Sequence, residues 1–224
     1  RRGSGRLSSG SGESPLRPEH FRRTDDTNDA AFYEIPRLVT HIDDAAIRAA
    51  TEFYRDLLPA GGRVLDLMSS WVSHLPEDVE YGHVAGLGMN AEELAANARL
   101  HERVVQDLNM NPSFSWPDRS FDAAIVTVSV QYLTRPADVF REVGRILSPG
   151  APFAVLYSNR CFPTKAVAAW RMLDARGHAD LIGLYFRLSG AFGPPAVYDL
   201  SPRPGVSDPL YAVVAGTAGD PTQT

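Results

Sequence analysis

One stretch decides the fold: residues 63–76 read RVLDLMSSWVSHLP. It follows the Gly61-Gly62 pair, opens as a short apolar run, and leads into an acid and two serines. A short apolar run bounded in this way predicts a buried parallel strand that feeds a tight turn. Ligands of open α/β sheets bind outside the carboxyl ends of such strands, so we expect a ligand site at Asp66 and residues 68–71.

Strands and helices are predicted to alternate around this stretch. Asp43-Asp44 can cap a helix that runs to about Leu58. Asn90 and Glu93, three residues apart, have the spacing of a capping box. Strands are expected at about 82–86, 101–106, 123–128 and 152–157, helices at about 68–75, 91–99, 136–147, 166–176 and 179–188, and a closing hairpin at 197–200 and 210–215. This alternation predicts an α/β fold: a mostly parallel sheet with helices on both faces.

Composition places the chain among ordinary globular proteins. It has 224 residues, is 44% hydrophobic and 22% charged, and carries a formal net charge of -5. That charge gives no electrostatic case for nucleic acid, and no apolar run approaches the ~18 residues of a membrane span. Cys161 is the only cysteine. We therefore expect no disulfide and no Cys-based zinc site, a reducing compartment, and no role for a metal.

The chain is predicted to hold one domain with two flexible ends. Residues 1–27 are rich in Gly, Ser and Arg and poor in apolar residues, so they are expected to form a flexible tail. The domain is placed at residues 28–218 and a flexible end at 219–224. The cytoplasm is the expected location, with an organelle as the alternative, because an Arg/Ser-rich, acid-poor start is also typical of targeting peptides.

Three later segments, taken together and in order, resemble one enzyme family. They read VQDL at residues 105–108, WPDRSFD at 116–122 and FREVGRILSPG at 140–150. In these segments the chain resembles the class I S-adenosylmethionine (SAM)-dependent methyltransferases, of the type 11-like kind, and the likeness extends over about 60–215. The resemblance implies a Rossmann-like seven-stranded sheet with an antiparallel last strand, and SAM as the cofactor.

The resemblance also implies roles for single residues. Asp66 would support the first loop and the methionine amine, or serve only as a structural turn residue. Asp107, with Leu108, would meet the adenine, or cap a loop. Asn90 caps a helix and could also take one ribose hydroxyl. Ser129, after the fourth strand, would line the sulfonium end of the cofactor.

The first loop departs from the family pattern. The family usually has glycines where this chain has Met68, Ser70 and Val72, and an acid for the ribose where it has Gly88. The hydroxyl groups and amides of Ser69 and Ser70 could still receive the cofactor. The form DLMSSWVSHLP is identified with a subgroup of methyltransferase-like proteins, which argues against random decay.

The segment before the domain's first long helix carries two further candidates. Arg37 could pair with the methionine carboxylate through a charge-assisted bond, and His41 could act as general base. In the family this region often closes over the cofactor. The alternative is an ordinary helix N-terminus with ordinary caps.

Together these patterns predict a SAM-dependent methyltransferase (EC 2.1.1) that transfers a methyl group to O or N of a small molecule. Two alternatives stay open: other chemistry on the same fold, and a non-catalytic binding or scaffold protein on a degenerate methyltransferase fold. The chain is expected to be a monomer or a homodimer, without nucleic-acid or membrane partners.

Overall fold

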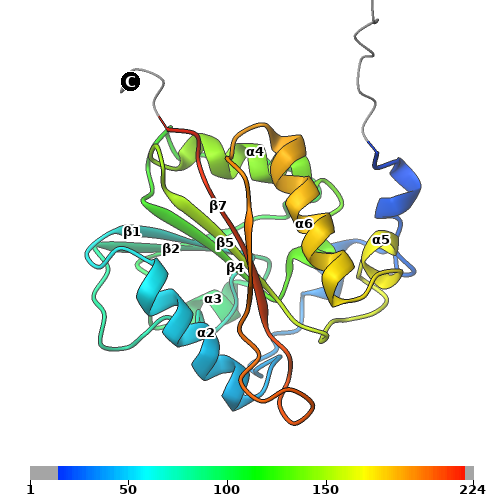
Figure 1. Cartoon of the computed structure of the whole chain (residues 1–224), viewed down its shortest axis with the longest axis horizontal. Helices are drawn as coiled ribbons and strands as arrows, with labels where there is room; N and C mark the ends of the chain where they lie inside the picture. Colours follow the sequence, from blue (N-terminus) through cyan, green and yellow to red (C-terminus); the bar gives the residue numbers. More distant parts are fainter. Residues whose placement is uncertain (1–14, 220–224) are drawn as a thin grey trace, which may run out of the picture.

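The computed structural model describes residues 15–219, and every structural statement below concerns that part of the chain. Seven strands form one sheet in the order β3-β2-β1-β4-β5-β7-β6 (Figure 1). Strand β7 runs antiparallel to both of its neighbours, and the other pairings are parallel. The strands are β1 (Arg63–Leu67), β2 (His83–Gly88), β3 (Glu102–Val105), β4 (Ala123–Thr127), β5 (Pro152–Tyr157), β6 (Ala196–Asp199) and β7 (Tyr211–Gly216). The predicted fold class is therefore confirmed.

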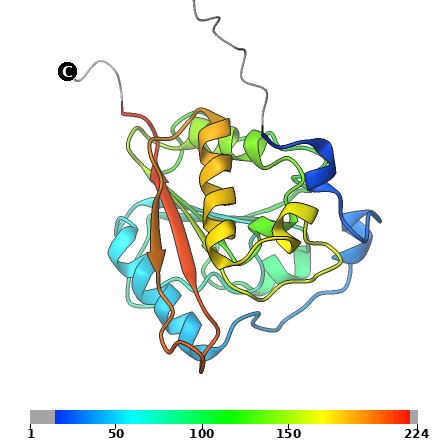
Figure 2. The same cartoon turned by 45° about the vertical axis from the view of Figure 1, so that its right-hand side comes forward.

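Side chains alternate across the sheet and divide the core into two layers. On β1, Val64 packs on one face, whereas Leu65 and Leu67 pack on the other. Helices α2 (Asp44–Leu57) and α3 (Ala91–Ala96) cover the face of Val64. Helices α4 (Pro136–Ile146), α5 (Ala168–Arg171) and α6 (Ala175–Ser189) cover the opposite face (Figures 1 and 2). Both faces are thus buried, as a central parallel sheet requires.

The predicted helix over residues 68–75 does not form. Met68 and His74 both adopt left-handed backbone angles, with φ of 56° and 55°, which a right-handed helix cannot contain. The Asp66 carboxylate also draws the hydroxyl groups of Ser69 and Ser73 towards itself. The segment after β1 is therefore an irregular loop that is folded around one buried acid.

Three other predicted helices have different bounds. Helix α3 ends at Ala96 rather than near residue 99, because the Asn97 side chain donates to the Ser70 carbonyl and the Ser73 hydroxyl instead of continuing the helix. The segment predicted as a helix over 166–176 holds only the short α5, and α6 begins at Ala175, where Asp174 caps it. The strand predicted at 82–86 continues to Gly88, which brings the end of β2 next to Asn90.

The expected tail does not extend to residue 27. Residues 18–32 include the short helices η1 (Pro18–Phe21) and α1 (Asp29–Phe32), which are packed on the domain. The Ala168 amide donates to the Arg22 carbonyl, and the Asp25 amide donates to the Thr164 carbonyl. The predictions for residues 1–14 and 220–224 lie outside the described residues. Within residues 15–219, no helix has the length and apolar character needed to cross a membrane.

Candidate active site

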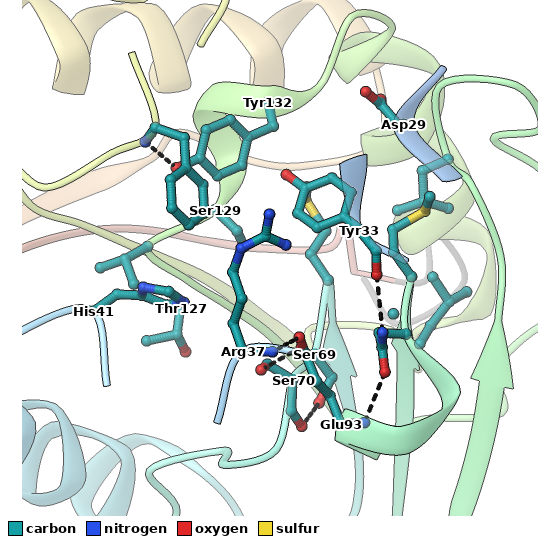
Figure 3. Close-up of a pocket in the computed structure, with 18 of the residues that line it drawn as sticks. Asp29, Tyr33, Arg37, His41, Ser69, Ser70, Glu93, Thr127, Ser129 and Tyr132 are labelled. Atoms are coloured by element: carbon teal, nitrogen blue, oxygen red, sulfur yellow. Dashed lines mark hydrogen bonds between the residues drawn. The ribbon is translucent and has the colours of Figure 1, made fainter. Parts of the chain in front are cut away.

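A cavity of about 390 Å³ opens at the carboxyl ends of β1 to β4 (Figure 3). Its volume lies within the range of about 300–1,000 Å³ that is common for small-molecule sites. Eight of the nine residues predicted for the site line it: Arg37, His41, Ser69, Ser70, Asn90, Asp107, Leu108 and Ser129. The ninth, Asp66, lies behind Ser69 and borders a smaller adjoining cavity. The structure thus brings the predicted residues together, and their roles stay predictions.

Asp66 organises the loop beneath the cavity. Its Oδ2 atom accepts hydrogen bonds from the hydroxyl groups of Ser69 and Ser73, each at 2.6 Å. Burial raises the pKa of Asp66 to about 6, although these two donors act in the opposite direction. Asp66 therefore holds the loop beneath the cavity, and both of its predicted roles stay predictions.

We call Ser69, Ser70, Gly88, Asn90 and Glu93 the β1–β2 wall of the cavity. The Ser69 amide donates to the Leu87 carbonyl at 2.7 Å, which lays the loop against the end of β2. A Cβ atom on Gly88 would then stand only 2.2 Å from the Ser69 carbonyl oxygen. A backbone atom cannot move aside cheaply, so no side chain can replace Gly88 while the loop keeps this course.

Asn90 is fully engaged by the protein itself. Its Oδ1 atom accepts from the amides of Glu92 and Glu93 and so caps α3, as predicted. Its Nδ2 group donates to the carbonyls of Tyr33 and Glu34. A bond from Asn90 to a ribose hydroxyl would need one of these contacts to open.

We call Asp107, Leu108, Val128 and Ser129 the β3–β4 wall. Only Oδ1 of Asp107 accepts the hydrogen bonds found for that carboxylate, from the amides of Asn109 and Met110. The Ser129 hydroxyl is buried and has no hydrogen-bond partner among the described residues. Val128 has a φ of 49°, which is a strained angle for a β-branched residue. Orphaned polar groups and backbone strain are both typical of functional sites.

Residues 29–41, which we call the cover, contribute Asp29, Tyr33, Arg37, Thr40 and His41 to the cavity lining. The Arg37 guanidinium lies 4.6 Å from the centre of the Phe32 ring and 5.4 Å from that of Phe162. Its Nη2 group also donates to the Phe32 carbonyl at 2.9 Å. Figure 3 shows the Arg37 side chain extending between Tyr33 and Tyr132. Aromatic rings on several sides fix the direction of this guanidinium before any ligand arrives.

His41 belongs to the cover and faces the cavity from its edge. Its ring meets the Phe162 ring edge-on, with 5.5 Å between the ring centres. Partial burial lowers the pKa of His41 below its usual value; Glu93 acts against this shift and Arg37 adds to it. The neutral imidazole is therefore the main form near neutral pH, and it can accept a proton.

A buried ion cluster fastens the cover to the domain. Lys165, the only lysine of the chain, is 0% exposed and donates to the Thr27 carbonyl at 2.7 Å. It lies 3.1 Å from Asp29, which also accepts both bonds of a forked contact from Arg23 and one from Asn109. Burial opposes the ionisation of Asp29, but these three donors hold its pKa below the usual range. The cover is thus anchored by largely buried charges.

Sequence reasoning missed several cavity residues. Asp29 and Tyr33 lie at the start of the predicted domain, directly after the residues that were predicted as a tail. Tyr132 had no motif to mark it. Glu93 was noticed only as a capping-box residue, yet its carboxylate accepts from the Arg37 amide and the Ser70 hydroxyl instead. Burial raises the pKa of Tyr132 to about 12, so this phenol stays protonated at neutral pH. Within residues 15–219, no group of three or more His, Cys, Asp or Glu residues could hold a metal ion.

The sheet order and the antiparallel β7 are those of the Rossmann-like methyltransferase fold. Residues 68–155 match the family model described as a methyltransferase domain. No curated protein matches the chain.

Solved structures share the fold at low identity. The crystal structure of the [4+2]-cyclase SpnF is 17% identical, with a TM-score of 0.59 over 86% of this chain and 92% of that one. A SAM-dependent methyltransferase from Aquifex aeolicus is 15% identical, with a TM-score of 0.54 over 85% and 97% of the two chains. One from Mesorhizobium loti is 18% identical, with a TM-score of 0.51 over 75% and 97%. Likeness at these identities concerns the fold, and the chemistry has to be argued from the site.

Proposed function

We propose that this chain is a SAM-dependent methyltransferase (EC 2.1.1) that acts on O or N of a small molecule. The observation that carries the proposal is the single cavity in which Arg37, Asp107 and Ser129 meet at the strand ends. Bound SAM supplies a methyl group on a positively charged sulfur. The protein's own task is then to position the acceptor, exclude water and receive a proton.

The residues of the cavity fit such a cofactor. The orphaned Ser129 hydroxyl needs a polar partner, and Oδ2 of Asp107 is open to an amine donor. The Arg37 guanidinium is held in place by aromatic rings and can pair with a carboxylate through its remaining N–H groups. We assign Asp107 to the adenine end of SAM, Ser129 to the sulfur end and Arg37 to the amino-acid end.

His41 is the group that we assign to proton removal from the acceptor. It lies at the cavity edge. Because its pKa is lowered, the neutral imidazole, which can act as a base, is the main form at pH 7. Arg160 and Cys161 also border the cavity on this side, so we place the acceptor between them and His41. Burial raises the pKa of the Cys161 thiol, which argues against Cys161 as a nucleophile.

A second function is favoured by one observation. The loop without glycines places the Ser69 carbonyl where the family has a ribose-binding acid. An enzyme of this fold that performs non-methylating chemistry is therefore the alternative, and the similar fold of a [4+2]-cyclase is compatible with it. A non-catalytic scaffold is less well supported, because a scaffold has no use for an orphaned hydroxyl in a small-molecule cavity.

Calorimetric titration with SAM and S-adenosylhomocysteine tests the proposal. We expect saturable binding of both by the folded chain. A folded chain that binds neither would overturn the proposal. Mass spectrometry of acceptor mixtures incubated with SAM then separates a methyltransferase, which adds 14 mass units to an acceptor, from an enzyme with other chemistry.

The His41 assignment has its own test once an acceptor is known. His41→Ala should reduce turnover by about 100-fold or more while SAM affinity stays nearly unchanged, because general bases contribute about 10²–10⁴-fold to rates. The fall should be smaller for a substrate whose acceptor atom carries no proton at the assay pH. An equal loss of turnover and SAM affinity would make His41 a binding residue.

A further inference from the structure

The end of β2 cannot supply a side chain to the cavity. Any Cβ atom at Gly88 would stand 2.2 Å from the Ser69 carbonyl oxygen and 3.2 Å from the Leu94 side chain. Contacts under about 3 Å with a backbone atom are not relieved by a rotamer change. If a carboxylate serves this wall of the cavity, it must come from another element.

Glu93 is a buried carboxylate on the same wall. It stands in the first turn of α3, is 8% exposed, and lines the cavity. Its Oε1 atom accepts from the Arg37 amide and its Oε2 atom from the Ser70 hydroxyl, both at 2.7 Å (Figure 3). The cover and the loop thus hold the carboxylate in place from two sides.

This carboxylate has acceptor capacity that the described residues leave unused. Its two oxygens offer about four lone-pair sites, and the two hydrogen bonds found for it occupy half of them. No Lys, Arg or His among residues 15–219 forms an ion pair with Glu93 within 4.0 Å. A buried carboxylate without a cation is stabilised best by further O–H or N–H donors.

The neighbouring polar groups are already engaged in hydrogen bonds within the protein. Asn90 uses its whole amide on α3 and the cover. The Ser70 hydroxyl donates to Glu93, and the Ser69 hydroxyl donates to Asp66. Glu93 is therefore the one carboxylate on the β1–β2 wall, and a ligand hydroxyl can bind it without breaking a bond of the protein.

We propose that Glu93 binds the ribose hydroxyl groups of the adenosyl cofactor, in place of an acid at the end of β2. The assignment rests on the proposed function. Two adjacent hydroxyl groups supply the neutral donors that this carboxylate lacks, and a charged acceptor makes such bonds stronger than neutral ones. Glu93 then connects three parts of the site: the ligand, the Arg37 segment of the cover, and the Ser70 segment of the loop.

The test combines a change in the protein with a change in the ligand. S-adenosylhomocysteine and its 2′-deoxy and 3′-deoxy analogues are titrated calorimetrically into the wild type, Glu93→Gln and Glu92→Gln. In the wild type we expect loss of at least one hydroxyl to weaken binding by about 10-fold or more. In Glu93→Gln that penalty should shrink to about threefold or less, because the charged acceptor is gone.

Glu92→Gln is the matched control, since it makes the same chemical change one residue away on the exposed side of α3. It should keep the wild-type penalty. Glutamine at position 93 can still accept from the Arg37 amide and contact Ser70, so the wall should stay folded. An undiminished deoxy penalty in Glu93→Gln overturns the assignment while leaving the proposed function intact. Failure of the wild type to bind S-adenosylhomocysteine would instead remove the proposed function itself.

Discussion

The two walls of the cavity treat their polar groups in opposite ways. On the β1–β2 wall, Ser69, Ser70 and Asn90 bond to other parts of the protein. On the β3–β4 wall, the Ser129 hydroxyl has no partner among the described residues. The first wall is also where the sequence departs from the family pattern, and the second is where it agrees. Ser69, Ser70 and Asn90 of the first wall thus serve contacts within the protein, and Glu93 keeps acceptor capacity, whereas the Ser129 hydroxyl of the second wall makes no such contact.

The largest effect is expected from a substitution that disrupts the β1–β2 wall. Gly88→Ala places a methyl group 2.2 Å from the Ser69 carbonyl oxygen, so the loop or the strand must move. Overpacking a close contact costs about 1–3 kcal/mol and occasionally more, and we expect about 3 kcal/mol here because the opposing atom is backbone. Urea unfolding measures the change in the free energy of unfolding.

Gly193→Ala is the control for this change. The nearest atom to its new methyl group is the Gly216 carbonyl oxygen at 3.8 Å, which is an ordinary contact. It should change the free energy of unfolding by less than about 0.5 kcal/mol, as surface substitutions usually do. Equal stabilities of the two variants would show that the loop does not lie against β2 as described.

A second prediction concerns the acid beneath the first wall. The pKa of Asp66 is raised to about 6 in the folded chain from 3.8, so between these values the folded state holds more protons than the unfolded state. The stability that Asp66 contributes is therefore fully present below pH 3.8 and is lost as pH rises through about 6. Asp66→Asn removes this titration.

The measurement is urea unfolding of the wild type and Asp66→Asn at several pH values between about 4 and 7.5. The wild type should lose stability relative to the variant as pH rises, by between about 1 and 3 kcal/mol, since one pKa unit corresponds to about 1.4 kcal/mol. Ser73→Ala removes one hydrogen bond that favours the charged form and should steepen the loss. A difference that does not vary with pH would mean that Asp66 keeps an ordinary pKa.

The third prediction concerns Asp107 on the β3–β4 wall. Asp107→Asn keeps an oxygen to accept from the Asn109 and Met110 amides, but it replaces the acceptor at Oδ2 by a donor. SAM affinity should fall about tenfold, or about 1.4 kcal/mol, because the adenine amine would face a donor. Asp118→Asn, at a carboxylate that is 72% exposed, should leave SAM affinity unchanged. Equal affinities of the three proteins would remove Asp107 from the site.

The sequence predicted the architecture well because alternating apolar runs record burial directly. The run at residues 63–67, the Pro136 helix start and the closing hairpin all stand within about two residues of their predicted bounds. The site was predicted to the level of which residues share one cavity, since the carboxyl ends of neighbouring parallel strands must meet.

What could not be predicted depends on contacts between distant residues. The left-handed turn at Met68 results from hydrogen bonds that join the loop to β2 and to Asn97, a residue 29 positions later in the chain. Likewise, residues 15–27 look like a tail because the residues that hold them, among them Lys165, come far downstream. The composition of a segment describes only that segment. It cannot show that residues far away in the sequence hold the segment through buried ion pairs.

The smallest effect is expected from restoring the family's glycines in the loop. Met68 already adopts a φ of 56°, so Met68→Gly relieves backbone strain but gives up the partly buried side chain. Ser70→Gly removes only the donor to Glu93. Neither change moves the Ser69 carbonyl. Ser69 is held in place by the hydrogen bond from its amide to the Leu87 carbonyl and by the hydrogen bond from its hydroxyl to Asp66. SAM affinity of the double variant should therefore stay within about twofold of wild type, or about 0.4 kcal/mol. Calorimetric titration of both folded proteins measures it, with the two single variants to separate loop strain from the loss of the Glu93 contact. Binding that is tighter by about fivefold or more, roughly 1 kcal/mol, would show that the loop is a decayed glycine loop and not one that is built for its larger side chains.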